Sequence, residues 1–369
     1  MALTSAEKQH LINFANALID QQNAQVIIEP QGHRYGYWFG GGNIVADSDG
    51  NLYLVGRYRN FGDSRTGLGM GERGLELAIF KSADQGRSFE KIVSRPKASL
   101  NVGERSVLSI EGAALHFSKR GVELFISTEK RGIGYPDEIA NYLKPGSGVW
   151  TIDYLRANTV EGLASAALQT LIACRDPRWL HVKDPSVYIR PNNDLLLGFV
   201  THPFNWSSSN TAYAVRPQGT DQFEPPVYDF FPRGFAWDVA ICRATSWLHV
   251  PQLGAFANHP PLALLFYDGG ESLRDLDAHK SAVTRPRGYS CEELGGLAVA
   301  AGDGTTQIER LSTNFPMFVS PHGTGTSRYV DVLETADGFY ATWQQSQPDQ
   351  SQPLVMNFLS RADAIKLLS

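Results

Sequence analysis

Short apolar strands alternate with polar turns along most of the chain, and one such unit recurs. In this unit an apolar strand is followed by a tight turn and by a second apolar strand that ends in polar residues. Turn pairs such as Asp49-Gly50 and Asp337-Gly338 are typical of β-hairpins. The pattern therefore predicts five antiparallel hairpins, over residues 41–59, 109–131, 182–202, 235–270 and 327–345.

The spacing between these hairpins leaves room for two more strands in each unit. Four antiparallel strands repeated around an axis make a β-propeller blade. No helical pattern alternates with the strands, which argues against an α/β barrel. We therefore predict an all-β fold, a five-bladed β-propeller of four-stranded antiparallel blades with a short N-terminal helix.

The two ends of the chain carry the predicted helices. Residues 4–22 have an apolar face that includes Leu11, Phe14 and Leu18, and a short helix is predicted over residues 361–368. We expect residues 1–24 to form a helix packed on the outside of the propeller and residues 25–369 to form one propeller domain. The strand at residues 25–29 should complete the last blade and close the ring.

A polar turn motif supports the propeller. Residues 82–89, SADQGRSF, match the Asp box S-x-D-x-G-x-x-F/W of sialidases and other propellers. Its Ser and Asp are expected to accept hydrogen bonds from turn amides, and its Gly allows the tight backbone. We assign this turn a structural role and no chemistry.

Composition and charge exclude several functions. The net charge is −5 and no basic residues cluster, so no nucleic-acid partner is expected. No apolar run is long enough to span a membrane. Three widely spaced cysteines form no metal or redox motif and fit a reducing compartment. The N-terminus has no signal-peptide pattern, so the cytoplasm is the default location, with secretion left open because a leader could have been removed.

The geometry of a propeller selects candidate site residues. Inner strands begin beside the central channel and second strands end there, so both line one pocket. Three predicted blades place a carboxylate at that position: Glu111, Asp184 and Asp238. Inner strands are otherwise apolar and buried, where a carboxylate is costly unless it is paired or functional. We expect these three acids to be the catalytic group, although each taken singly has a structural explanation.

Seven other residues near the predicted channel are candidate substrate contacts. They are Arg57, Arg59, His202, Trp237, Arg328, Tyr329 and Asp331. The arginines either bind a substrate anion or pair with the acids. The aromatic rings either stack on a sugar or pack in the core, and His202 is also explained as a structural histidine. No cofactor or metal motif is present, but acidic residues near the axis leave room for a channel cation such as calcium.

Two segments carry a resemblance to known enzymes. EGAALHFSKRGVELFIS (residues 111–127) and KDPSVYIRPNNDLLLGFV (residues 183–200) resemble patterns of the five-bladed propeller glycoside hydrolases of families 43 and 32. The resemblance implies that Glu111 is the general acid and that Asp184 modulates its pKa. Two features depart from the family pattern: Glu111 precedes Asp184, and Asn43 with glycines replaces the first-blade aspartate. The base would then be Asp238, with Asp331 as second choice.

The functional hypothesis is a glycoside hydrolase that acts on a glycan or oligosaccharide by carboxylate acid–base catalysis. Two alternatives remain. One is a polysaccharide lyase or sialidase-like enzyme, in which Arg57, Arg243 and Arg328 with Tyr329 would bind an anionic sugar. The other is a carbohydrate-binding propeller without catalysis. The fold alone cannot choose among them.

Overall fold

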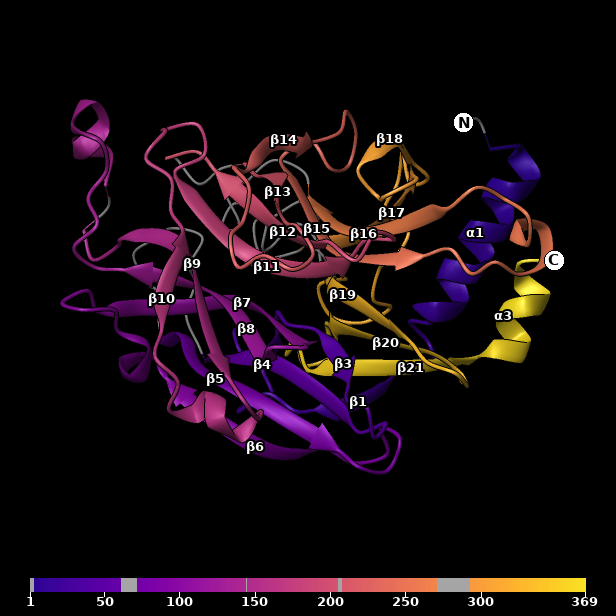
Figure 1. Ribbon diagram of the computed structural model, residues 1–369, viewed down its shortest axis with the longest axis horizontal. Coiled ribbons are helices and arrows are strands. Elements are labelled where there is room, and N and C mark those ends of the chain that lie inside the picture. Colours follow the sequence, from indigo (N-terminus) through magenta and orange to yellow (C-terminus); the bar gives the residue numbers. More distant parts are fainter. Residues whose placement is uncertain (1–2, 61–71, 144, 205–207, 271–292) are drawn as a thin grey trace.

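Five antiparallel sheets make up most of the chain (Figure 1). The computed structural model describes residues 3–60, 72–143, 145–204, 208–270 and 293–369. In four sheets four strands follow one another from the inside outwards, and in the remaining sheet β2 and β3 both pair with β4 as two pieces of one inner strand. The predicted five-bladed propeller is confirmed.

The strands of each blade are as follows. Blade one contains β2 (Trp38–Gly40), β3 (Ile44–Ala46), β4 (Leu52–Asn60), β5 (Glu72–Ser82) and β6 (Glu90–Pro96). Blade two contains β7 (Val107–Ser118), β8 (Gly121–Lys130), β9 (Val149–Ala157) and β10 (Gln169–Ile172). Blade three contains β11 (His181–Ile189), β12 (Leu195–His202), β13 (Asn210–Arg216) and β14 (Val227–Phe231). Blade four contains β15 (Ile241–His249), β16 (Leu262–Gly270), β17 (Leu294–Ala301) and β18 (Thr306–Arg310). Blade five contains β19 (Ser327–Glu334), β20 (Gly338–Gln345), β21 (Leu354–Ser360) and β1 (Gln25–Ile28).

The N-terminal strand lies in the last blade. β1 pairs antiparallel with β21, with Gln25 opposite Met356. Both ends of the chain therefore contribute to one sheet, which leaves no unpaired edge on β21.

Two α-helices, α1 (Ser5–Leu18) and α3 (Arg361–Leu367), lie side by side at one edge of the molecule (Figure 1). Thr4 and Glu7 form a capping box at the start of α1. The helix ends earlier than residue 22, because the Asp20 carboxylate accepts hydrogen bonds from the amides of Gln22 and Asn23 and so stabilises a turn. The apolar face of α1 packs into the core between blades four and five. Short 3₁₀ helices within the described residues are Lys97–Leu100, Asp137–Tyr142, Glu161–Ala164 and Gly254–Phe256.

The turn between β5 and β6 has the hydrogen bonds that its sequence suggests. The Ser82 hydroxyl accepts from the Gly86 amide at 2.8 Å, and the Asp84 carboxylate accepts from the Ser88 amide at 3.0 Å. Hydrogen bonds from Ser88 and Ser82 lower the pKa of Asp84 to about 2. These contacts give the turn a local structural role.

The inner strands share one irregularity. Their pairing register shifts near the start of β7, β11, β15 and β19, and blade one interrupts its inner strand between β2 and β3 at the same place. Such bulges bend a strand and redirect its side chains. Asp184 and Tyr329 lie in these bulges with φ values of 55° and 53°, a left-handed conformation that costs non-glycine residues free energy. The bulges place polar side chains around the axis.

No helix among the described residues is long and apolar enough to cross a membrane.

Candidate active site

Eight charged or phenolic side chains from all five blades meet at one end of the axis and are called the axial cluster below. They are Arg57 on β4, Glu111 on β7, Asp184 on β11, Arg243 on β15, Asp268 on β16, Glu293 just before β17, and Arg328 and Tyr329 on β19. Inner strands begin and second strands end at this face, so the hairpin order brings together all of these positions except Glu293, which precedes a third strand.

Glu111 pairs with Arg57 across two blades. Nε and Nη2 of Arg57 donate to Glu111 Oε2 at 3.1 and 2.8 Å, and Arg57 Nη1 donates to the Gly40 carbonyl. Burial raises the pKa of Glu111, but the positive charges of Arg57, Lys183 and Arg59 outweigh it and hold this pKa well below its usual range. Glu111 is therefore ionised.

Arg243 connects three carboxylates of the cluster. Its Nη1 donates to Asp184 Oδ2 at 3.1 Å, and its Nε and Nη2 donate to Asp268 Oδ2 at 3.0 and 2.6 Å. Nη2 also contacts Glu293, which accepts a further bond from Arg328 Nη1 at 3.0 Å. One buried guanidinium thus compensates charges that come from three separate strands or loops.

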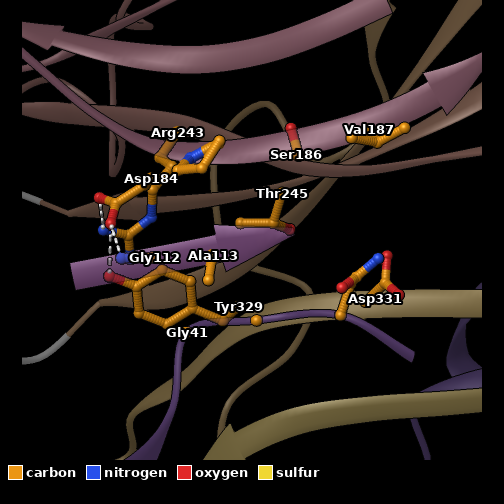
Figure 2. Close-up of a pocket in the computed structure, with 13 residues that line it drawn as sticks. Gly41, Gly112, Ala113, Asp184, Ser186, Val187, Arg243, Thr245, Tyr329 and Asp331 are labelled. Atoms are coloured by element: carbon orange, nitrogen blue, oxygen red, sulfur yellow. Dashed lines mark hydrogen bonds and ion pairs between the residues drawn. The ribbon is translucent and has the colours of Figure 1, made fainter. Parts of the chain in front are cut away.

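Tyr329 lies at the centre of the arginines. Its ring centroid is 3.9 Å from the Arg243 guanidinium carbon, 5.4 Å from that of Arg57 and 5.5 Å from that of Arg328. Burial raises the pKa of Tyr329 well above its usual range, so the hydroxyl stays protonated. It donates to Asp184 Oδ1 at 3.2 Å (Figure 2).

Asp184 is held from a second side by backbone. The Gly112 amide donates to Asp184 Oδ1 at 3.0 Å, and the Asp184 amide donates to the Ser127 hydroxyl. A Cβ atom on Gly112 would lie 2.7 Å from the Asp184 Cα, so only glycine fits here. The glycine in the Glu111-Gly112 pair thus allows two neighbouring blades to approach closely.

Asp268 differs from Glu111 in its preferred charge state. Burial and the negative charge of Glu293 raise the pKa of Asp268 to about 6, although Arg243 and the Tyr329 amide oppose this. Asp268 is therefore the carboxyl of the cluster that can hold a proton near neutral pH.

A small cavity continues from the cluster along the axis. Its volume is about 20 Å³, room for roughly one water molecule, and Asp184, Arg243 and Tyr329 lie on one side of it (Figure 2). Asp331 lies on the other side, where its Oδ2 accepts from the Ile44 amide at 2.9 Å. Burial raises the pKa of Asp331 to about 6.

Replacing Asp331 with asparagine is expected to change how stability depends on pH. A carboxyl whose pKa is higher in the folded protein stabilises the fold at low pH, and this contribution is lost as pH rises through about 6. Relative to the wild type, Asp331→Asn should gain about 2 kcal/mol between pH 4.5 and 8. Urea unfolding at several pH values measures this, with the exposed Asp337→Asn as control. Parallel pH curves for the wild type and Asp331→Asn would contradict it.

Two predicted site residues lie away from the axial cluster. The inner strand of blade four begins at Ile241, so Trp237 and Asp238 precede it. Asp238 is buried and its Oδ2 accepts from Arg310 Nε at 2.8 Å. Its Cβ lies next to Gly269, on the side of the strand to which a side chain at position 269 would point. Side chains alternate along a strand, so the side chain of the preceding residue, Asp268, points to the opposite side. Asp238 therefore lies on the face of the sheet opposite the cluster.

Trp237 packs in the core and is not a stacking platform at the axis. Its ring stacks on Tyr267 with centroids 5.5 Å apart, and its Nε1 donates to the Ser312 carbonyl at 2.8 Å. The ring is buried between blades three and four. The core-packing explanation of this residue is the one that its contacts favour.

The remaining predicted residues lie beside the cluster. The Arg59 guanidinium is 4.2 Å from the ring centroid of Trp38, and the Arg328 guanidinium is 4.4 Å from the same ring. His202 is buried on β12, and burial with the nearby charges of Lys183 and Arg243 lowers its pKa well below the usual range. His202 is therefore neutral.

The sequence analysis did not place Arg243 at the centre of the cluster, and it did not consider Glu293 as a site residue. Arg243 is directly opposite Asp268 in the pairing of β15 with β16. The correct start of the fourth hairpin would have revealed this pair. Glu293 enters from the start of a third strand, a position that the inner-hairpin rule does not consider.

The expectation of no cofactor, with a channel cation left open, stays a prediction. Across the residues that the structure describes, no group of three or more His, Cys, Asp and Glu side chains is arranged to hold a metal ion. The carboxylates of the axial cluster are instead arranged around arginines.

The fold and the axial cluster define a five-bladed β-propeller with a charged centre. No family model and no curated protein matches the sequence. Solved structures do share the fold. An α-L-arabinofuranosidase from Lactobacillus brevis matches with a TM-score of 0.56 and 11% identity, over 90% of this chain and 91% of that one.

Two other similar structures have comparable coverage. A thermostable family-43 glycoside hydrolase matches with a TM-score of 0.52 and 10% identity, over 88% of this chain and 91% of that chain. A GH43_1 enzyme from Xanthomonas citri complexed with xylotriose matches with a TM-score of 0.51 and 10% identity, over 95% and 93%. At such identities the likeness establishes the fold, which is that of five-bladed family-43 propellers.

Proposed function

We propose that this protein is a glycosidase that hydrolyses an oligosaccharide at the axial cluster. The observation that carries the proposal is the meeting of four carboxylates from three blades at one axial position, with different preferred charge states. Glycoside hydrolysis needs one carboxyl that is protonated and one that is ionised. The shared fold with family-43 glycoside hydrolases supports the same chemistry.

Glu111 is the carboxylate that meets the substrate in this proposal. Its side chain is 14% exposed, compared with 2% for Asp184, 0% for Asp268 and 8% for Glu293. The resemblance gave Glu111 the role of general acid, but its lowered pKa favours the ionised form. We therefore assign it the role of base or nucleophile.

Asp268 is the proton donor in this scheme. Its pKa of about 6 keeps a useful fraction protonated near neutral pH. Because Asp268 is fully buried, its proton reaches the leaving oxygen through a hydrogen-bonded water molecule. Asp184 is a positioning residue that lies beside Glu111 and Asp268. Its carboxylate is held in place by hydrogen bonds from Tyr329, Gly112 and Arg243.

The balance of charge favours hydrolysis over the lyase or sialidase-like alternative. Those alternatives need arginines that are free to bind a sugar carboxylate. Arg57 pairs with Glu111, while Arg243 and Arg328 pair with Glu293. His202, the lyase base considered from the sequence, is buried, which argues against its contact with a substrate proton.

The test is a release assay on nitrophenyl α-L-arabinofuranoside, nitrophenyl β-D-xyloside and xylotriose, sugars suggested by the similar solved structures. We expect kcat/KM to fall as pH rises through about 6, because Asp268 then loses the proton it must donate. In Asp268→Asn, activity should be lost, and in any activity that remains the fall of kcat/KM near pH 6 should be absent or shifted. A product that absorbs in the near ultraviolet would identify a lyase, and cleavage that is unaffected by pH between 5 and 8 would refute the role of Asp268.

A further inference from the structure

A groove runs along the rim of blade three, on the same face as the axial cluster. Its volume is about 280 Å³, near the lower end of ligand pockets. It is lined by Arg178, Trp179, Thr201, Pro203, Ser208, Ser209, Asn210, Asp229 and Arg233. Thr201 lines the groove, and the next residue, His202, lies within electrostatic reach of Arg243. The groove therefore lies at the same end of β12 as the cluster.

An aromatic stack forms one wall of this groove. Trp179 and Tyr228 are parallel within 5° with ring centroids 4.4 Å apart, and the Arg178 guanidinium carbon is 4.1 Å from the Trp179 centroid. The Arg178 side chain is 70% exposed and pairs with Asp176. Tyr228 and Arg178 therefore cover the two faces of the Trp179 ring, and the exposed Arg178 guanidinium is the flat group that the stack offers to a sugar ring.

Hydrogen-bonding groups form the floor of the groove. Asp229 Oδ1 accepts from Trp179 Nε1 at 3.3 Å and from Asn210 Nδ2 at 2.9 Å. No described residue donates to Asp229 Oδ2, which leaves that oxygen as an acceptor for a ligand. Asp229 has a left-handed φ of 55°.

A second hollow continues the groove outwards. It has a volume of about 370 Å³ and shares Asn210 and Arg233 with the first hollow. Arg233 is exposed, and within the described ranges it forms no ion pair. Phe235 follows the lining residue Gly234 and is fully exposed. The two hollows together form one continuous trough.

We infer that this rim groove binds the distal sugar units of a chain whose cleaved bond lies at the axial cluster; the inference rests on the proposed function. The lining offers a planar stack, amide and hydroxyl groups, and charges of both signs. That combination suits the many hydroxyl groups and apolar ring faces of a neutral sugar. An isolated anion would instead need an excess of positive charge, which Asp229 and Asp176 reduce. The substrate is accordingly an oligosaccharide of several units.

The test uses xylohexaose and α-1,5-arabinohexaose as probes, with Trp179→Ala and Arg233→Ala as variants. Isothermal titration of a non-cleaving protein should give at least a roughly ten-fold weaker Kd for the bound hexaose in each variant, the loss expected for one charged hydrogen bond or stacking contact. KM for the hexaose should rise as much, while turnover of the nitrophenyl glycosides stays unchanged. The matched control is Arg175→Ala, an exposed arginine that does not line the groove.

The outcomes separate this inference from the proposed function. Hexaose binding that depends on Trp179 and Arg233, without any cleavage, would refute the glycosidase and keep the groove. Cleavage of the hexaose with unchanged Kd and KM in both variants would refute the groove and keep the glycosidase. The inference is overturned if neither hexaose binds the wild-type protein at millimolar concentration. It is also overturned if the two variants turn over the nitrophenyl glycosides and the hexaoses with equal losses.

Discussion

Replacing Glu111 with glutamine is expected to lower kcat about a thousand-fold, because the amide can act neither as a base nor as a nucleophile. The amide oxygen can still accept from Arg57, which donates to Glu111 Oε2 at 2.8 Å, so the local geometry is kept. KM for the best substrate should change little. The measurement is steady-state kinetics, with circular dichroism to verify that the propeller is folded.

The matched control is Glu334→Gln. Glu334 pairs with Arg361 at 2.9 Å, a geometry like that of Glu111 with Arg57, but at the surface beside α3. Its loss should cost less than about 1 kcal/mol and leave kcat unchanged. If Glu111→Gln retains wild-type kcat while it is folded, Glu111 takes no part in the reaction and the assignment fails.

Replacing Arg243 with methionine is expected to give the largest loss of stability. The change leaves Asp268 and Glu293 buried without their main counter-charge, and removing one partner of a buried pair costs about 3–5 kcal/mol. Urea unfolding at pH 7.5 would detect this loss. Arg361→Met, which breaks a surface pair, serves as the control.

The pH dependence of Arg243→Met distinguishes lost charge from lost packing. Without Arg243, the pKa of Asp268 rises further above its unfolded value, and the pKa of Glu293, which Arg243 and Arg328 lower in the wild type, rises as well. The folded state of the variant therefore binds more protons than the folded wild type does. Stability should therefore fall more steeply than in the wild type as pH rises from 5 to 8. A deficit that is the same at every pH would show that Arg243 contributes by packing and not by charge.

The hairpin pattern was sufficient to predict the five blades. Paired turn residues such as Asp49-Gly50 fix local register, and the number of hairpins fixes the number of blades. Strand starts were less certain where no polar residue marks the boundary. In the fourth unit the apolar stretch extends back to Phe235, so the inner strand was placed about six residues before its true start at Ile241. That error explains the misplacement of both Trp237 and Asp238.

The sequence could predict where several cluster residues lie, but not which residues they pair with. Glu111, Asp184 and Tyr329 follow from the hairpin order, since each lies near the start of an inner strand. Their charge states depend on residues from other blades: Arg57 sets that of Glu111, and Glu293 contributes to that of Asp268. A bulge at each inner strand decides which side chain points to the axis, and turn signals do not encode it.

The pairing of β1 with β21 has a consequence for the order of assembly during synthesis. Gln25 precedes the strands of blades one to four in the chain, but its partner Met356 follows all of them. Blades one to four contain only strands that are neighbours in the chain and can form as the polypeptide emerges. The pairing of β1 with β21 can form only after the other four blades have been made, which makes it the slow, long-range step of folding.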